Sequence, residues 1–107
     1  MDKENKRKNG PLPTSARCIC TLRTPKDCNL LLAGIYRCRI TKEQLADIKD
    51  EGYLTIGCSP QNNIVVTNII CPLNPKKCVE ELHCFVYQKG KTYWIYDNST
   101  TGTMIEL

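Results

Sequence analysis

Hydrophobic residues recur along the chain in short runs, and clusters of turn-forming residues separate the runs. Runs this short, with alternating or β-branched apolar residues, are typical of strands, because a helix needs a longer amphipathic stretch. We expect strands over residues 16–22, 53–56, 64–66, 82–88, 92–96 and 104–107, and residues 29–33 and 35–40, which Gly34 separates, as two strands or one bent strand. The turn Lys89-Gly90-Lys91 joins two of them as a hairpin. Many short strands with frequent turns indicate an all-β sandwich or barrel.

One segment between the strands has the pattern of a helix start. Thr41-Lys42-Glu43-Gln44 forms a capping box, in which the Thr41 hydroxyl accepts from the amide of Gln44 while the Gln44 side chain reaches back. Leu45 and Ile48 follow at helical spacing. We therefore expect one short helix over residues 42–49.

Charge divides the chain into a tail and a domain. The formal net charge is +4, and much of the excess lies at Lys3, Lys6, Arg7 and Lys8. We expect a disordered basic tail over residues 1–15 and one folded domain over residues 16–107. The remainder is close to neutral, which disfavours a nucleic-acid-binding face. No stretch is long enough to cross a bilayer, so no membrane partner is expected.

The chain has eight cysteines, an even number that would allow four disulfides. Cys18, Cys20, Cys38, Cys58, Cys71 and Cys84 lie in or beside apolar strand-like runs. There is no C-x-x-C pair, the only histidine is His83, and no signal peptide is apparent. The favoured interpretation is reduced core thiols in an intracellular protein, nuclear or cytoplasmic, with disulfides and a metal site as alternatives.

Three segments occur in an order and spacing that resemble a known family. They are YLTIGCSPQNNI at residues 53–64, VEELHC at residues 79–84 and YWIYDNSTTGT at residues 93–103. They resemble the I-G-R-s-x-x-N-D-I, S-R-x-H and Y-x-x-x-D-x-S-x-N-G-T motifs of the forkhead-associated (FHA) domain. The resemblance implies an FHA-like β-sandwich of short antiparallel strands with one short helical insertion.

The residues that match the family have structural roles in it. By resemblance, Gly57 ends a strand and lets the following loop turn, and His83 braces the binding loops through hydrogen bonds. Asp97, Ser99, Gly102 and Thr103 match the final turn, where Gly102 is expected to have a positive φ. Asn62 and Ile64 match N-D-I, with Asn63 in place of the aspartate.

The residues that depart from the family are those that bind phosphothreonine in it. Cys58 replaces an arginine, Glu80 and Glu81 replace a serine and an arginine, and Thr101 replaces an asparagine. A phosphate carries nearly two negative charges, so acidic residues beside it oppose binding. The hypothesis is that the usual site is disabled, with Lys76 and Lys77 as partly compensating phosphate contacts. The positions equivalent to the binding loops are Cys58, Ser59, Glu80, Glu81, His83, Ser99 and Thr101.

The last strand raises a question about the completeness of the sheets. The family continues past G-T with further strands, whereas this sequence ends at Leu107. The missing strands come from the N-terminal half, or the chain is cut, or a partner supplies them. An unpaired sheet edge favours association, as a homodimer or within a hetero-complex.

The leading functional hypothesis is a non-catalytic protein–protein interaction module, a scaffold or adaptor, with no cofactor and no metal. Tyr87, Trp94 and Tyr96 are candidates for its core or for an interface. One alternative is a phosphopeptide-binding module with a rearranged site that uses Ser59, Ser99 and Lys76 or Lys77. Another is a secreted disulfide-rich ligand or inhibitor, in which Asn98-Ser99-Thr100 would be a glycosylation site. An enzyme fits worst, because His83 adjoins Cys84 on one strand and their side chains point to opposite faces.

Overall fold

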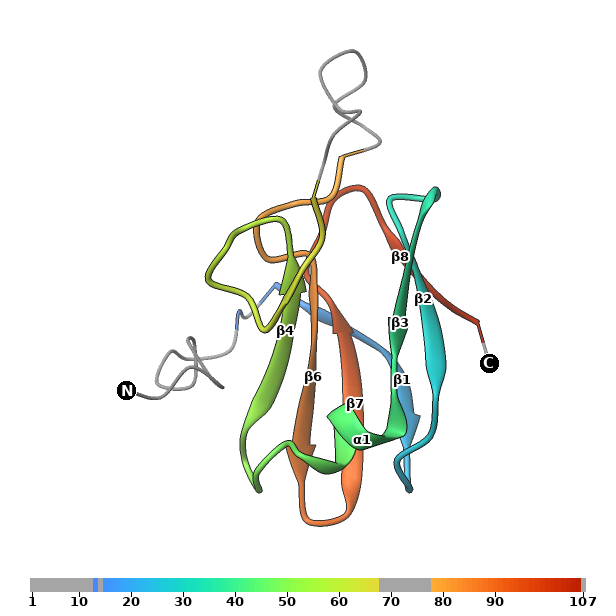
Figure 1. Cartoon of the computed structure of the whole chain (residues 1–107), viewed down its shortest axis with the longest axis vertical. Helices are drawn as coiled ribbons and strands as arrows, with labels where there is room; N and C mark the ends of the chain where they lie inside the picture. The colour runs from blue at the N-terminus through green and yellow to red at the C-terminus, as the bar shows by residue number, and fades with distance from the viewer. Residues whose placement is uncertain (1–12, 14, 68–77, 107) are drawn as a thin grey trace.

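Two β-sheets face each other across a hydrophobic core in the computed structural model, which describes residue 13, residues 15–67 and residues 78–106 (Figure 1). The larger sheet contains, in spatial order, β1 (Arg17–Leu22), β7 (Thr92–Asp97), β6 (Cys84–Lys89), β4 (Tyr53–Gly57) and β5 (Ile64–Val65). The smaller sheet contains β3 (Tyr36–Ile40), β2 (Cys28–Leu32) and β8 (Thr103–Glu106). The predicted all-β sandwich with one short helix is therefore confirmed.

The pairing of β4 with β5 differs from the purely antiparallel arrangement that the sequence predicts. These two strands are parallel, with Ile56 opposite Ile64, whereas every other strand pair of the described residues is antiparallel. The reason lies in a pair of hydrogen bonds that draws the connecting loop back along β4. Asn63 N donates to Thr55 Oγ1 at 3.0 Å, and Asn63 Oδ1 accepts from Thr55 N at 2.9 Å. The chain then turns again and runs beside β4 in the same direction.

The core is made from alternate residues of both sheets. Leu30 and Ile40 of the smaller sheet, and Ile56, Val86 and Ile95 of the larger one, are fully buried. Because successive side chains of a strand point to opposite faces, this alternation puts one apolar row of each strand into the interior. Burial of each such side chain contributes about 1.5–3 kcal/mol to folding.

The outer face of the larger sheet carries a row of aromatic residues. Phe85 stacks on Tyr96 with ring centroids 5.1 Å apart, and Tyr87 lies 5.8 Å from Trp94. These side chains alternate with the core residues of β6 and β7, so they point away from the smaller sheet. Tyr87, Trp94 and Tyr96 are therefore not part of the core between the sheets, and they shield one another from solvent across neighbouring strands.

The helix α1 (Lys42–Ala46) begins as the sequence predicts and ends earlier. Both bonds of the capping box form: Gln44 N donates to Thr41 Oγ1 at 3.1 Å, and Thr41 N donates to Gln44 Oε1 at 2.9 Å. The predicted extension to residue 49 is wrong, because Asp47 is the C-cap and the chain turns there toward β4. Leu45 anchors the helix in the core with no exposed surface. Among the described residues, no helix is long and apolar enough to cross a membrane.

Strands from the N-terminal half contribute to both sheets. β1 pairs with β7, and β2 pairs with β8 on one side and with β3 on the other. The N-terminal half therefore supplies some of the strands in question, whereas a cut chain and a strand from a partner stay predictions. Of the predicted tail, only Pro13 and Ser15 fall within the described residues, and its boundary with the domain stays a prediction.

The cysteines of the described residues differ in state and in burial. The free thiols are Cys18, Cys20, Cys28, Cys38, Cys58 and Cys84, and Cys78 is disulfide-bonded. Burial raises the pKa of Cys38 to about 11 and raises that of Cys84 further, so both behave as apolar core residues. Cys18 does not fit the interpretation as a core thiol, because it is exposed next to an irregularity in the β1–β7 register. The predicted core thiol Cys71 lies outside the described residues.

We expect Thr41→Ala to lower the free energy of unfolding by about 1 kcal/mol, because the substitution removes the side-chain acceptor that caps α1. Thr41→Ser keeps the hydroxyl and serves as the matched control, with a loss well below that of the alanine variant. Urea denaturation of the three proteins measures the effect. An equal loss in both variants would mean that the cap contributes nothing.

Candidate functional site

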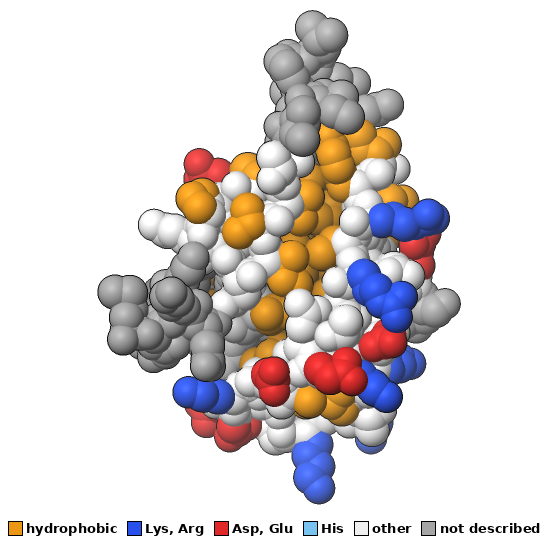
Figure 2. All heavy atoms as spheres, viewed as in Figure 1, with side chains coloured by type: hydrophobic (Ala, Val, Ile, Leu, Met, Phe, Trp, Pro, Cys, Tyr) orange, Lys and Arg blue, Asp and Glu red, His pale blue; other side chains and the backbone are white. Residues whose placement is uncertain are grey.

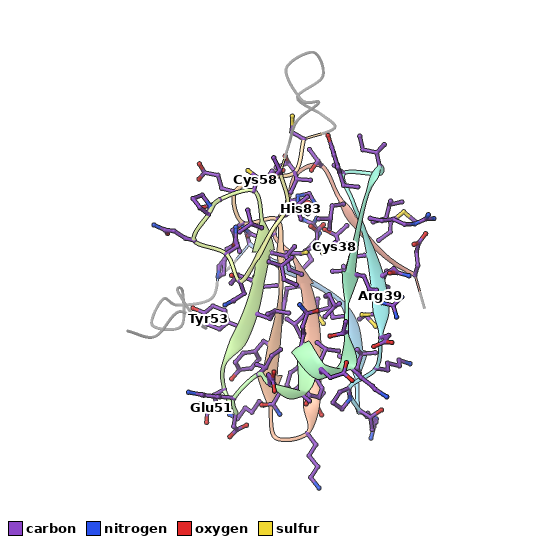
Figure 3. All side chains as sticks on the ribbon, in the orientation of Figure 1. Cys38, Arg39, Glu51, Tyr53, Cys58 and His83 are labelled. Atoms are coloured by element: carbon purple, nitrogen blue, oxygen red, sulfur yellow. The ribbon has the colours of Figure 1, made fainter. Side chains whose placement is uncertain are left out.

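Three loop segments meet at one end of the sandwich, residues 58–63 after β4, residues 78–83 before β6 and residues 98–102 between β7 and β8. Figure 3 shows Cys58 and His83 at this end. β6 pairs antiparallel with both β4 and β7, so its first residues lie beside the last residues of its two neighbours. Backbone bonds join the segments: Cys58 N donates to Glu80 O at 3.0 Å, and Asn98 N donates to His83 O at 2.9 Å.

His83 links two of these segments through its ring. The side chain is fully buried. Its Nδ1 accepts from Glu80 N at 3.1 Å, and its Nε2 lies 2.8 Å from Gly102 O. A carbonyl oxygen can only accept, so Nε2 carries the proton and donates, which fixes the tautomer of the ring. Both ring nitrogens of His83 are thereby hydrogen-bonded to backbone groups, and neither is left for catalysis or for a ligand.

Gly57 is required by the close approach of two chain segments. A Cβ atom at this position would lie 2.1 Å from Glu81 O and 2.8 Å from Asn62 Nδ2. The Asn62 amide sits in this gap and donates to Glu81 O at 2.5 Å and to Ser59 O at 3.0 Å. Positive φ, the property that a turn-forming glycine supplies, occurs at Gly102 (φ 100°) and not at Gly57. Gly57 ends β4, as the resemblance implies, and the requirement for glycine comes from the close approach and not from a positive φ.

Asp97 is the centre of the turn between β7 and β8. Its Oδ1 accepts from Ser99 Oγ at 2.6 Å, from Ser99 N at 3.0 Å and from Thr103 Oγ1 at 2.8 Å. Its Oδ2 accepts from Arg17 Nη2 at 2.7 Å, which ties β1 to the site. Burial raises the pKa of Asp97, but the bonds from Ser99 and Thr103 and the charge of Arg17 outweigh it and hold the pKa below its usual value.

The Glu80 side chain lies against the loop after β7. Its Oε2 accepts from Thr100 N at 2.6 Å, from Thr100 Oγ1 at 2.7 Å and from Thr101 N at 3.2 Å. Burial raises the pKa of Glu80, but these hydrogen bonds outweigh it, so the pKa lies below the usual value and the carboxylate is ionised at neutral pH. The loop after β7 thus already holds an anion, which belongs to the chain itself.

The remaining predicted residues surround this contact. Thr101 Oγ1 donates to Cys78 O at 3.0 Å, and Ser59 Oγ accepts from Gln61 N at 3.3 Å. Cys58 and Ser59 are partly exposed, whereas Glu81 is exposed. An open pocket of about 570 Å³ lies beside the segment before β6. Its lining residues are Cys78, Val79, Glu80, Glu81, Leu82 and Asn98. The predicted phosphate contacts Lys76 and Lys77 lie outside the described residues.

Two contributions to the site were missed from the sequence. Arg17 reaches Asp97 from a strand 80 residues earlier, and Asn98 Nδ2 donates to Leu82 O at 3.0 Å. Nothing in the local pattern around either residue signals its partner, because both contacts depend on the strand order. Within the described ranges, no group of three or more metal-ligating side chains is arranged to hold an ion.

Residues 54–106 match the family model of the FHA domain. The match contains all three loop segments of the site. No curated protein and no solved structure is significantly similar to the chain.

We expect Gly57→Ala to lower the free energy of unfolding by about 3 kcal/mol or more, because the added methyl group would meet a backbone carbonyl that cannot move alone. Gly90→Ala is the control, since its Cβ would meet nothing within 4 Å and only its positive φ is unfavourable. That strain costs about 1–2 kcal/mol. Chemical denaturation compares the two, and a Gly57→Ala protein as stable as Gly90→Ala would contradict the close approach.

Low pH should destabilise the turn between β7 and β8, because it protonates Asp97. Its folded pKa is depressed, so ionised Asp97 stabilises the fold above the unfolded pKa of about 3.9, and this stabilisation is lost as the pH falls through the folded value. Asp97→Asn should cost about 1–3 kcal/mol at neutral pH. The difference in stability between the variant and the natural protein should shrink as the pH falls through the lowered pKa of folded Asp97. Thermal unfolding at several pH values measures this difference in stability. Asp47→Asn, at an exposed position, is the control and should leave the stability unchanged.

Proposed function

Because the chain carries an FHA domain, a protein-interaction module that usually binds phosphopeptides, we propose that it binds a partner protein without relying on phosphothreonine at the usual loop site. In this proposal the chain is a non-catalytic scaffold or adaptor. The described geometry supports it through one contact, the carboxylate of Glu80 on the amides of Thr100 and Thr101.

This contact affects a phosphate in two ways. It uses backbone and hydroxyl donors that an incoming anion would need, and it keeps a negative charge beside them. Two negative unit charges about 4 Å apart repel each other by about 4 kcal/mol in an effective dielectric of ~20. A phosphate carries nearly two such charges. A phosphopeptide would have to displace Glu80 or tolerate this repulsion.

The three loop segments also lack the groups that would attract a phosphate. None of residues 58–63, 78–83 and 98–102 is lysine or arginine. Phosphate recognition in proteins depends on a guanidinium fork or an ammonium group close to the oxygens. In the part of the chain that the structure describes, Arg17 approaches the site, and it is paired with Asp97. In the described residues, the loop end therefore favours a partner that brings no phosphate, while Lys76 and Lys77 directly precede residue 78 outside them.

The two alternatives receive less support. A rearranged phosphopeptide site would use Ser99, but its hydroxyl is buried, donates to Asp97 Oδ1 and accepts from Gly102 N at 2.8 Å. A secreted disulfide-rich ligand would need its cysteines paired, yet six of the described ones are free. The free thiols support an intracellular location, nuclear or cytoplasmic. A homodimer and a hetero-complex both stay open within the proposal.

Calorimetry with matched peptides, with and without phosphothreonine, tests the proposal. We expect the natural protein to bind both forms equally or neither. The combined variant Cys58→Arg, Glu80→Ser, Glu81→Arg and Thr101→Asn should prefer the phosphorylated form by at least about tenfold, because it restores a fork and frees the loop amides.

Glu43→Arg with Asp47→Lys on α1 is the control for charge, since it changes the net charge by the same amount away from the loops. It should leave the two peptides indistinguishable. Low-micromolar binding of the phosphorylated peptide alone to the natural protein, abolished by substitutions in residues 58–59 and 80–81, would overturn the proposal.

A further inference from the structure

The two sheets differ in width, and the difference leaves one side of the sandwich uncovered. The larger sheet has five strands and the smaller has three. β1 and β8 contact each other and close one side. On the opposite side, β4 and β5 lie at one edge and β3 at the other, and in the described residues no strand lies beyond β3 (Figure 1). The inner face of β4 and β5 therefore extends past the strand that should cover it.

A band of apolar side chains fills this open side. Figure 2 shows hydrophobic side chains running between β4–β5 and β3. Tyr36, Leu54, Ile64 and Val66 pack against the core and remain partly exposed. α1 lies at the lower end of the band in the view of Figure 1, and its Leu45 is fully buried. We call this surface the β3 groove. It adjoins an edge strand, which presents backbone N–H and C=O groups to any chain that lies beside it.

The side chains of β3 give the groove a defined chemistry. Cys38 and Ile40 are buried and face the core, whereas Arg37 and Arg39 are exposed on the outer face. Arg37 pairs with Glu106 at 3.1 Å and Arg39 with Asp27 at 2.9 Å, both on the surface. Exposed pairs of this kind contribute little to stability, so both guanidinium groups can also interact with a new neighbour.

A second copy of β3 does not fit this edge. Two antiparallel copies with matching faces would place Arg37 opposite Arg37 or Arg39, or Arg39 opposite Arg39, because residues directly across a sheet share one face. Like charges in such positions are destabilising. Residues 1–12 of the same chain fit poorly as well, since they carry an excess of lysine and arginine. A strand that suits the edge must bring negative charge.

We propose that β3 accepts an extended segment of a partner protein in which apolar and acidic residues alternate. Its apolar side chains cover Leu54, Ile64 and Val66, and its acidic side chains face Arg37 and Arg39 on the other side of the extended sheet. Backbone bonds to β3 supply affinity, and the alternating side chains supply specificity. This surface is separate from the loop segments that hold Glu80.

Fluorescence anisotropy tests the proposal with a labelled synthetic peptide of about seven residues that alternates valine and glutamate, a usual strand length. The comparison peptide has lysine in place of each glutamate. We expect the glutamate peptide to bind the full chain at least about tenfold more tightly. Arg37→Glu with Arg39→Glu should reverse the preference. Arg23→Glu with Lys91→Glu, an equal change of charge at other exposed sites, should leave it unchanged.

A second pair of variants tests the apolar side of the groove without changing charge. Val66→Ser should lower the affinity for the glutamate peptide several-fold. Val65→Ser, on the opposite and exposed face of the strand, should leave this affinity unchanged. Hydrogen exchange should show new protection in residues 36–40 when the peptide binds. Equal binding of the two peptides, no binding of either, or protection elsewhere in the chain would overturn the proposal.

Discussion

The buried imidazole of His83 connects parts of the chain that no regular strand pairing would hold together. One ring nitrogen accepts from the amide of Glu80, and the other donates to the carbonyl of Gly102, which lies 19 residues after His83. This fixes the segment before β6 against the loop after β7. The Glu80 carboxylate can then reach Thr100 and Thr101, because its own backbone is held at the right distance. The geometry of the loop end follows from a histidine whose hydrogen-bonding capacity is fully used.

Around this constraint, charged groups act as structural elements. Asp97 and Glu80 each gather several donors, and both are ionised because those bonds outweigh the cost of burial. A loop end built in this way depends on carboxylates of its own chain for its shape. The loop end of this FHA domain therefore has the carboxylates of Asp97 and Glu80 and the ring of His83 engaged in internal hydrogen bonds.

The sequence predicts local features well and long-range ones poorly. The sandwich and the capping box at Thr41 follow from short patterns, and the structure confirms both. The reason for Gly57 could not be found in this way, since the atoms that exclude a side chain belong to residues 62 and 81. Glu80 was interpreted from its charge alone. Its hydrogen bonds to Thr100 depend on two strands meeting at one end, which no local pattern encodes.

The pairing of β1 with β7 has a consequence for how the chain folds. Arg17 and Asp97 are 80 residues apart in sequence, yet they form one end of this strand pair. Contacts between such distant residues carry a large loop-closure entropy, and folds dominated by them form slowly. During synthesis, β1 would leave the ribosome long before its partner is made. Its hydrogen-bonding groups stay open for that interval, so the nascent chain passes through a period in which aggregation competes with folding.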